Sequence, residues 1–398
     1  MDYQSPPQIP MSLPDLSETE RQAVLDVVST PNLSMGPKIL EFEAAFQRLT
    51  GCRHAIAVNS GTAGVHLCVC AAGINEGDLV ITTPFSFVAS TNAILFERGV
   101  PVFVDVDPRS GNIDSALVEQ AARDLSGGGK AARRWLPRRV AAQHQRGRHW
   151  IKAIMAVDIF GQPADFDSLQ CTAHNYGLKL IEDSCEALGA TYQGRPAGSL
   201  GDYGVFGFYP NKQITTGEGG MVVTNDGAAA DLMRALRNQG RAPGDTWLQH
   251  TYLGYNYRLD ELSAALGAAQ MSRLEDLLQA RQRTADWYAV RLVRIPGVEP
   301  PFISPQTTRS SWFVYVIRLE RGIDRKAVAS RLAQYGVPVR PYFSPIHLQP
   351  YMIERYGYRA GDYPVTEDLG ARGLALPFSG RMSEEQVEKV CQALARSV

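Results

Sequence analysis

Lys212 stands between two apolar segments, at a place where a lysine side chain can do chemistry. It ends the apolar run 206–211, and a stretch rich in glycine and threonine, 213–220, leads on to the strand-like residues 221–224. Most lysines are solvated surface residues. An amine delivered into a tight turn between two buried segments can instead form a Schiff base with a carbonyl group. The context therefore predicts a chemical role for this amine.

Two other segments supply partners for such an amine. Residues 59–64 follow the strand-like stretch 55–58 and open a helical stretch, and the free N–H groups of a helix start form a seat for phosphate. The apolar stretch 179–182 ends on Asp183, where open α/β sheets place ligands. Each segment also has a structural interpretation. Residues 59–64 could be an ordinary strand-to-helix turn, and Asp183 or Ser184 could be a helix N-cap.

Together, a phosphate seat, a carboxylate and a lysine are the parts needed by a pyridoxal 5'-phosphate enzyme. In that interpretation Lys212 forms a Schiff base with the cofactor aldehyde. The carboxylate of Asp183 pairs with the protonated pyridine nitrogen and keeps the ring an electron sink. Once the substrate amine has displaced it, Lys212 can carry a proton between substrate and cofactor.

The chain resembles the sugar aminotransferases of the DegT/StrS group through short motifs spread over nearly its whole length. The motifs are Met35-Gly36-Pro37, Asn59-Ser60-Gly61-Thr62-Ala63, Thr83-Pro84-Phe85-Ser86-Phe87, Phe160-Gly161-Gln162-Pro163, Glu182-Asp183, Phe208-Tyr209-Pro210-Asn211-Lys212 and Gly254-Tyr255-Asn256-Tyr257-Arg258. The group consists of fold-type-I pyridoxal-phosphate enzymes that aminate nucleotide-linked keto sugars. The resemblance implies an α/β fold like that of aspartate aminotransferase, with a large, mostly parallel-sheet domain and a smaller C-terminal α+β domain.

The resemblance implies cofactor-binding roles for particular residues. Lys212 bonds to the cofactor and Asp183 meets the pyridine nitrogen. Gly61 and Thr62 hold the phosphate. Phe87 stacks on the ring, with a core phenylalanine as the alternative.

The resemblance also implies substrate contacts and a partner subunit. Asn256 reaches the phosphate from the neighbouring subunit of a homodimer with shared active sites. Tyr209 and His347 are assigned to the substrate. Because His347 lies in a segment with several prolines, packing within a loop is the alternative for this residue.

Three positions depart from the commonest pattern of the family. Gly207 replaces a serine that touches the cofactor phosphate, so one phosphate contact is missing. Glu186 takes the place of a glutamine or histidine near the cofactor's phenolic oxygen, where a carboxylate would repel a phenolate unless protonated or turned away. We still assign Glu186 to cofactor binding. Asp158 replaces a histidine that is frequent in the family. Its side chain could face the substrate or cap the end of a strand, and both interpretations stay open.

Periodicity divides the chain into two domains. From about residue 54 to 240, short apolar strands such as 79–82, 102–104 and 151–157 alternate with helical stretches, which is typical of a parallel sheet covered by helices. A long helical stretch from 260 to 293 leads toward a C-terminal strand at 312–317 and to helices at 325–334 and 383–395. We expect residues 1–255 to form the N-terminal segment and cofactor-binding domain, and 256–398 the linking helix and small domain.

Composition agrees with an ordinary globular enzyme. Forty basic and 41 acidic residues give a formal charge of −1, which does not indicate a nucleic-acid partner. The six cysteines show neither paired metal spacing nor a disulfide framework, so no metal site is expected and a reducing cytoplasm fits best. No signal peptide or membrane-spanning stretch is expected.

Residues 126–149 interrupt the pattern with three consecutive glycines at 127–129 and seven lysine and arginine residues but no acidic ones. The composition predicts a solvated, mobile surface insertion. The alternative is that some of its arginines line the active-site mouth and hold the diphosphate of the substrate, because the arginine fork suits phosphate oxygens.

The predicted reaction is a ping-pong transamination. Glutamate or glutamine donates an amino group to the cofactor, and a nucleotide-linked keto sugar, expected to be a 4-keto-6-deoxyhexose, then accepts it. A 3-keto sugar or a keto cyclitol is an alternative acceptor. Three rival functions stay open: a sugar dehydratase of the same fold, a binding module that only retains the cofactor, and a site for an ordinary phosphate metabolite without a Schiff base.

Overall fold

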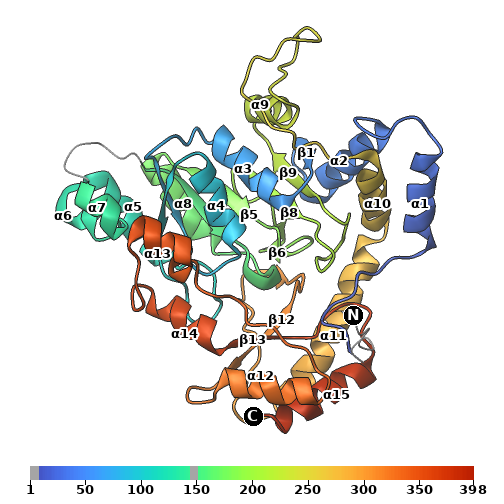
Figure 1. The fold of residues 1–398 in the computed structure, drawn as a ribbon, viewed down its shortest axis with the longest axis vertical. Coiled ribbons are helices and arrows are strands. Elements are labelled where there is room, and N and C mark those ends of the chain that lie inside the picture. The colour runs from blue at the N-terminus through green and yellow to red at the C-terminus, as the bar shows by residue number, and fades with distance from the viewer. Residues whose placement is uncertain (1–8, 144–150) are drawn as a thin grey trace.

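A seven-stranded sheet forms the centre of the computed structural model, which describes residues 9–143 and 151–398 (Figure 1). The strand order is β1-β9-β8-β5-β4-β2-β3. Neighbours from β8 to β3 run parallel, whereas β9 is antiparallel to both β8 and β1. The strands are β1 (His54–Val58), β2 (Leu79–Thr82), β3 (Val100–Phe103), β4 (Ile151–Val157), β5 (Lys179–Asp183), β8 (Tyr203–Gly207) and β9 (Gly220–Thr224).

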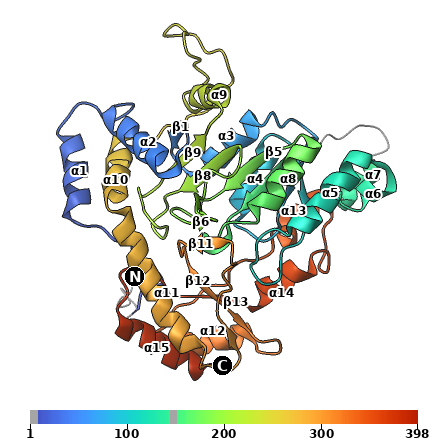
Figure 2. The same cartoon turned by 180° about the vertical axis from the view of Figure 1, so that it is seen from behind.

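Helices cover both faces of this sheet, and successive side chains of a strand alternate between them. Along β1, Ile56 and Val58 join the core under α3 (Gly61–Ala71), α4 (Val88–Phe96) and α9 (Gly227–Arg237). Ala55 and Ala57 face the core under α2 (Pro37–Thr50). Helices α5 (Ser115–Gly127) and α8 (Phe166–Tyr176) complete that second layer, which Figure 2 shows from behind. A sheet buried on both faces explains why its strands read as continuous apolar runs.

The C-terminal part packs around a second, three-stranded antiparallel sheet of order β10-β12-β13. Its strands are β10 (Val298–Glu299), β12 (Tyr315–Leu319) and β13 (Gly373–Leu376). Its core includes residues of α11 (Leu274–Leu292), α12 (Arg325–Gln334) and α15 (Glu384–Ala395). A third sheet, β11-β6-β7, pairs β11 (Thr307–Arg309) with β6 (Thr191–Tyr192), and β7 is Arg195–Pro196. Pairing of β11 with β6 therefore fastens the two parts of the chain to each other.

The remaining helices lie at the periphery. They are α1 (Glu18–Val28), α6 (Gly129–Arg133), α7 (Arg138–Gln143), α10 (Glu261–Ser272), α13 (Pro350–Tyr356), α14 (Pro364–Arg372) and the 3-10 turns Ile159–Gly161 and Ile346–Leu348. Among the described residues, none of the helices combines the length and apolar character needed to cross a bilayer.

Most predicted elements are confirmed. The strands at 79–82 and 151–157 and the helix at 325–334 have the predicted bounds, and Ser383 caps α15 with a capping box. The stretch 260–293 is two helices, because Arg273 between α10 and α11 leaves the helical conformation (φ −125°, ψ 24°). The predicted strand at 312–317 begins only at Tyr315, since Trp312 has a positive φ of 50°. The domain boundary at residue 255 stays a prediction.

Candidate functional site

Lys212 lies in the turn that follows β8 and precedes β9. Its backbone N–H donates to the carbonyl of Tyr209 at 2.9 Å. Its side chain is 14% exposed, and Nζ lies 3.7 Å from the centroid of the Phe313 ring and 3.8 Å from Glu186 Oε1. A separation of 3.8 Å is too long for a hydrogen bond. Within the described part of the chain, the amine therefore sits beside a carboxylate without being tied to it.

A buried arginine holds the backbone on which Lys212 stands. Arg281 of α11 is 4% exposed, and its guanidinium donates to the carbonyls of Trp312 (3.1 Å) and Phe313 (3.3 Å). It also donates to the carbonyls of Asn211 (3.3 Å) and Lys212. Burial lowers the pKa of Arg281 to about 10, so it remains charged at neutral pH. One side chain thus fixes both the lysine turn and the aromatic ring next to the amine.

Arg281 was not predicted from the sequence, although a signal existed. The arginine occupies the apolar face of α11, one turn from Leu277 and Leu278 and one turn from Ala285. A charged residue on a core-facing stripe is unusual, because burying a charge is costly unless hydrogen bonds satisfy it. Its four carbonyl partners come from two other segments, and no local pattern connects these to α11.

Asp183 ends β5 and is held in place by two hydrogen bonds. The hydroxyl of Ser90, from α4, donates to Oδ2 at 2.7 Å, and the N–H of Cys185 donates to Oδ1 at 3.2 Å. Ser86 Oγ lies 3.2 Å from Ser90 Oγ and supports it. No helix begins at residues 183–190, so the N-cap interpretation of Asp183 and Ser184 is wrong. The carboxylate is fixed at the carboxyl end of a central strand, as a ligand-binding role requires.

A layer of buried acids lies next to Asp183. Glu182 accepts the N–H groups of Gly198 (2.5 Å), Leu200 (2.7 Å) and Gly201 (3.1 Å). The hydroxyl of Ser184 lies 2.6 Å from Asp158 Oδ2 and 3.1 Å from Glu182 Oε1.

A single hydroxyl proton cannot serve both carboxyl groups at once. Because three backbone N–H groups stabilise the charge of Glu182, Asp158 is the member of this pair that favours the protonated form more strongly. Burial, and next the charge of Glu182, raises the pKa of Asp158 well above its ordinary value. Asp158 also accepts the N–H of Ala164 at 3.1 Å and is fully buried, so its side chain faces the interior.

Glu186 turns toward Lys212. One carboxyl oxygen accepts the N–H of Phe160 at 2.9 Å, and the other faces Nζ. Burial raises the pKa of Glu186, and the positive charge of Lys212 opposes that effect. Glu186, which was predicted to lie near the phenolic oxygen of the cofactor, therefore has one oxygen held by the backbone of Phe160 and the other beside the Lys212 amine.

The predicted phosphate seat is the N-terminus of α3. Ser60 is the N-cap, and its side chain accepts the N–H of Ala63 at 3.1 Å. A Cβ on Gly61 would lie 2.9 Å from Cys185 Sγ and 3.3 Å from the Cα of Gly207, so a larger residue would clash. At Gly207 a Cβ would meet Cys185 no closer than 3.5 Å, so a side chain would fit there. The N–H groups of Gly61 and Thr62, in the first turn of α3, lack intrahelical acceptors and lie among small residues, whereas those of Ala63 and Gly64 are bonded to Ser60.

Cys185 shows that these parts lie together. Its thiol is adjacent to the Gly61 backbone, and its pKa is raised well above the ordinary value by burial and next by the charge of Asp183. The charge of Lys212 lowers the same pKa. Amine, carboxylate and helix N-terminus therefore surround one residue. They match the aldehyde, ring nitrogen and phosphate of pyridoxal phosphate in chemical character.

Three other predicted residues lie on the surface. Phe87 immediately precedes α4 and is 62% exposed, and Tyr209 is 55% exposed. Asn256 is exposed as well, and its carbonyl accepts the side-chain N–H of Asn59 at 3.1 Å, directly before the phosphate seat. Their contacts with cofactor, substrate or a second subunit stay predictions.

His347 is fully buried and not open to the surface. Its Nε2 lies 3.0 Å from Glu367 Oε1, and its ring contacts Tyr363 and Tyr358. Burial lowers the pKa of His347, so the neutral ring is favoured. This arrangement favours the loop-packing alternative, and a contact with substrate stays a prediction.

The basic insertion differs from its prediction. Residues 129–133 and 138–143 form the short helices α6 and α7, and Ala132 and Leu136 are buried, so this part of the insertion is not wholly solvated. Its mobility stays a prediction, and residues 144–150 lie outside the described chain. Arg134 pairs with Asp124 at 2.5 Å, and Arg138 binds both carboxyl oxygens of Asp362 at 2.5 and 2.6 Å. The guanidinium groups of both arginines are therefore engaged in ion pairs within the chain, that of Arg138 with the C-terminal part.

Comparison with known proteins gives matches over the whole length of the chain. A family model described as DegT/DnrJ/EryC1/StrS aminotransferase family matches residues 14–395. The chain is 38% identical to GDP-perosamine synthase of Caulobacter vibrioides, over 98% of each chain, and 33% identical to GDP-perosamine synthase of Escherichia coli O157:H7, over 97% of each. Among solved structures, it is similar to DesV of S. venezuelae in complex with a ketimine intermediate, with a TM-score of 0.84, 29% identity and 98% of each chain covered.

Proposed function

Because the chain belongs to the DegT/DnrJ/EryC1/StrS aminotransferase family of pyridoxal-phosphate enzymes, we propose that it moves an amino group from glutamate or glutamine to a nucleotide-linked keto sugar. The family, the fold and the cofactor agree with the predictions from sequence. The acceptor proposed first is a 4-keto-6-deoxyhexose, with a 3-keto sugar, a keto cyclitol or a dehydration in place of amination as alternatives. Two relatives named for the synthesis of a nucleotide-linked amino sugar support the proposed acceptor class.

The observation that carries the proposal is that the Lys212 amine, which no hydrogen bond holds in the described chain, lies with Asp183 and the N-terminus of α3 around Cys185. When bound, pyridoxal phosphate supplies an aldehyde that takes up the donor's nitrogen and a ring that accepts electrons. Lys212 would bond to the aldehyde carbon of the cofactor. Once displaced, its amine would carry a proton between the substrate carbon and the cofactor carbon, and such a role contributes about 10²–10⁴-fold to the rate. If the amine were engaged in a short ion pair, that pair would have to break before the amine could react with the cofactor.

The other residues would orient the cofactor. Asp183, fixed by Ser90 and by the N–H of Cys185, would pair with the ring nitrogen. Gly61 and Thr62 would present backbone N–H groups to the phosphate. Phe87 and Tyr209 are exposed aromatic side chains that could cover the ring and the sugar. Glu186, with its free oxygen 3.8 Å from Nζ, would face the cofactor beside the Lys212 amine.

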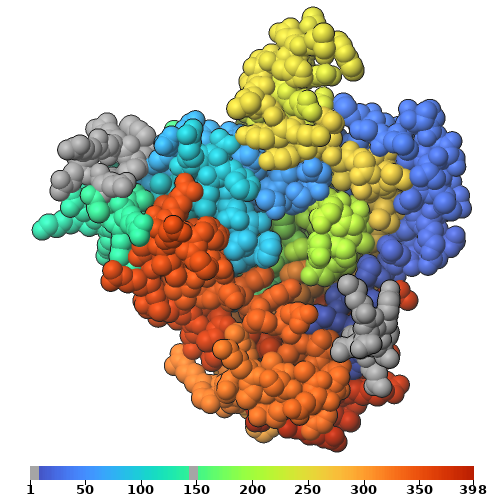
Figure 3. Space-filling model, in the orientation of Figure 1, coloured from blue at the N-terminus to red at the C-terminus, as the bar shows by residue number. Residues whose placement is uncertain are grey.

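The proposed active form is a homodimer. Residues 241–254 project from the body of the protein, at the top of Figures 1 and 3. Within them, Trp247, Leu248 and Leu253 are 78%, 82% and 90% exposed. Exposed apolar side chains gathered on one projecting segment mark an interaction surface. Since this segment ends next to Asn256, a second copy held there would receive that side chain near its own site.

An assay with defined substrates tests the acceptor. Purified protein is incubated with glutamate and a panel of nucleotide-linked 4-keto and 3-keto sugars, and products are identified by mass; Lys212→Ala serves as the control. We expect amination of a 4-keto-6-deoxy sugar by the wild type alone. A product that has lost water would indicate a dehydratase. Conversion of the bound cofactor by glutamate without amination of any sugar would contradict the nucleotide-sugar proposal.

A further inference from the structure

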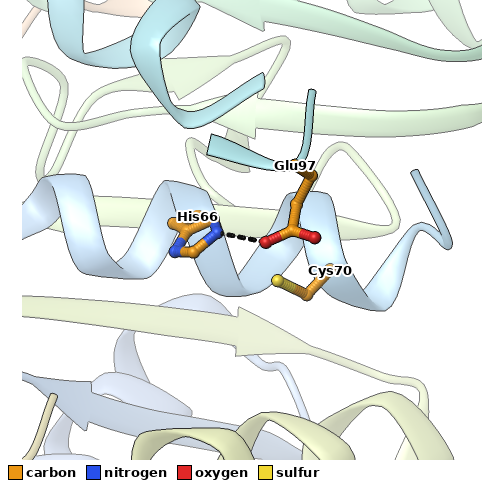
Figure 4. A group of neighbouring side chains, drawn as sticks. All are labelled: His66, Cys70 and Glu97. Atoms are coloured by element: carbon orange, nitrogen blue, oxygen red, sulfur yellow. Dashed lines mark hydrogen bonds and ion pairs between the residues drawn. The ribbon is translucent and has the colours of Figure 1, made fainter. Parts of the chain in front are cut away.

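A second cluster of ionisable side chains lies outside the lysine turn, between α3 and the end of α4. His66 and Cys70 are one turn apart on α3, and Glu97 follows the last residue of α4 (Figure 4). One donor atom from each residue lies within 4.8 Å of the other two. The three side chains point toward one another in Figure 4, so a single ion could contact all three.

We propose that His66, Cys70 and Glu97 bind one Zn²⁺ ion. Imidazole nitrogen, thiolate sulfur and carboxylate oxygen are the donors that zinc takes in proteins. Residues four apart on a helix project from the same face, so α3 presents two of them without any rearrangement of its backbone. Three protein ligands leave a fourth tetrahedral position for water or another donor. Glu97 is 29% exposed, which gives the ion a route from solvent.

Two tyrosines already form the outer shell that such a site needs. The hydroxyl of Tyr257 lies 3.0 Å from His66 Nδ1, and that of Tyr255 donates to Glu97 Oε1 at 3.0 Å. The tyrosine rings stack at 4.9 Å between centroids. Partners of this kind fix the orientation of a metal-binding imidazole or carboxylate. They leave His66 Nε2, 2.8 Å from Glu97, as the nitrogen that faces the ion.

Protonation states set the requirements for binding. Burial raises the pKa of Glu97, but hydrogen bonds from His66 and Tyr255 outweigh it and leave the pKa lowered, so a carboxylate is present at neutral pH. Burial, and next the charge of Glu97, raises the pKa of the Cys70 thiol to about 12. The ion must therefore displace the thiol proton and the proton between His66 and Glu97. The ionisable groups around Cys70 are His66, Glu97, Tyr255, Tyr257 and Cys68.

The position of the cluster gives the ion a consequence for the enzyme. Tyr255 and Tyr257 flank Asn256, and α3 begins with the glycine of the phosphate seat. An ion at the cluster would join α3 to the end of α4 and, through the tyrosines, to the segment that carries Asn256. Zinc would thereby stabilise the backbone around the cofactor phosphate without touching the cofactor.

Metal content tests the site independently of the sugar substrate. The full-length, cofactor-loaded protein is stripped with a chelator, dialysed against Zn²⁺ and analysed for bound metal. We expect about one zinc per chain. Cys70→Ser and Glu97→Gln should each weaken binding by at least about tenfold, the smallest cost seen even for loss of an outer-shell partner. Cys171→Ser is the matched control, because this exposed cysteine lies outside the cluster and its loss should change nothing.

Cobalt provides a second readout that does not depend on stoichiometry. Co²⁺ in the wild-type protein should give the visible bands of a tetrahedral site with a thiolate ligand, and Cys70→Ser should lose them. Absence of bound zinc in the wild type, or zinc binding unchanged in both Cys70→Ser and Glu97→Gln, would overturn the proposal. Either result would mean that the three side chains form only a hydrogen-bonded structural cluster.

Discussion

The lysine turn and the basic insertion use positive charge in opposite ways. The Lys212 amine lies 3.8 Å from Glu186 Oε1, and no hydrogen bond in the described chain holds it. In the insertion, Arg138 is bound by two hydrogen bonds to Asp362, and Arg134 pairs with Asp124. Lys212 is positioned through its backbone, whereas Arg134 and Arg138 are held by their charged ends. A side chain that must react or move keeps its reactive group free, whereas a structural cation does not.

Removal of the Lys212 amine should have the largest effect. We expect Lys212→Ala to lose at least about 10³-fold in kcat, because the side chain both bonds to the cofactor and carries the proton. Lys179→Ala is the matched control, since Lys179 pairs with Asp202 at 3.3 Å and should be dispensable. Steady-state rates with glutamate measure both variants. Equal losses in the two would remove the distinction between a free and a paired lysine.

Loss of the guanidinium behind the turn should come next. We expect Arg281→Met to lower kcat about 10–100-fold, because displacement of a reacting group by about 1 Å is enough for such a loss. The absorption spectrum of the bound cofactor should change as well. If the substitution only reduced the fraction of folded protein, the folded molecules would keep the wild-type spectrum. Arg281→Lys retains a charge and should recover part of the rate. Arg283→Met, on the exposed side of the same helix, is the control and should behave as wild type.

Stability should depend on pH through Asp158. Its pKa is raised in the folded protein, so the folded state favours the protonated form, and unfolding becomes more favourable as pH rises above about 4, where the unfolded side chain ionises. Stability from this group is present at low pH and is lost as pH rises through the folded pKa. Asp158→Asn cannot ionise and can still donate to Ser184.

Thermal unfolding between about pH 5 and about pH 8 measures this effect. Relative to wild type, the apparent unfolding temperature of Asp158→Asn should rise by about 2 °C or more toward the alkaline end, given about 1.4 kcal/mol per pKa unit. Parallel curves for the two proteins would show that Asp158 is ionised in the folded state.

The insertion should give the smallest effect. We expect Arg134→Ala and Arg138→Ala to leave kcat and KM for the nucleotide sugar unchanged and to cost about 0.2–1 kcal/mol of stability, which is typical of exposed ion pairs. An increase in KM without a change in stability would restore the prediction that these arginines hold the substrate diphosphate.

Local patterns predicted the parts of the fold that depend on local physics. Strands buried on both faces are continuous apolar runs, and the capping box at Ser383 lies within four residues, so both could be recognised. The N-cap interpretation of Asp183 failed because its main partner, Ser90, is 93 residues away in sequence. The helices of the insertion were missed because the apolar residues around them, such as Leu136 between the two helices and Val140 of α7, belong to a cluster that includes Tyr356 and Tyr358 of the C-terminal part.

Motifs predicted the chemical residues of the site but not what positions them. Lys212, Asp183 and Gly61 were found because they stand in short ordered motifs. Arg281 makes its side-chain hydrogen bonds with residues 31 to 70 positions away, and the His66 cluster is completed by Glu97 at the end of another helix. Such contacts follow from the packing of helices and strands that lie far apart in the chain, so no short sequence motif contains both partners.

Chemical trapping of the cofactor tests the central claim that Lys212 is its covalent partner. The purified, cofactor-loaded protein is reduced with borohydride, digested and analysed by mass spectrometry. We expect a single modified peptide with the cofactor on Lys212, and no stable modification in Lys212→Ala. A modification at another lysine, or none in a protein that still transfers amino groups, would contradict this account.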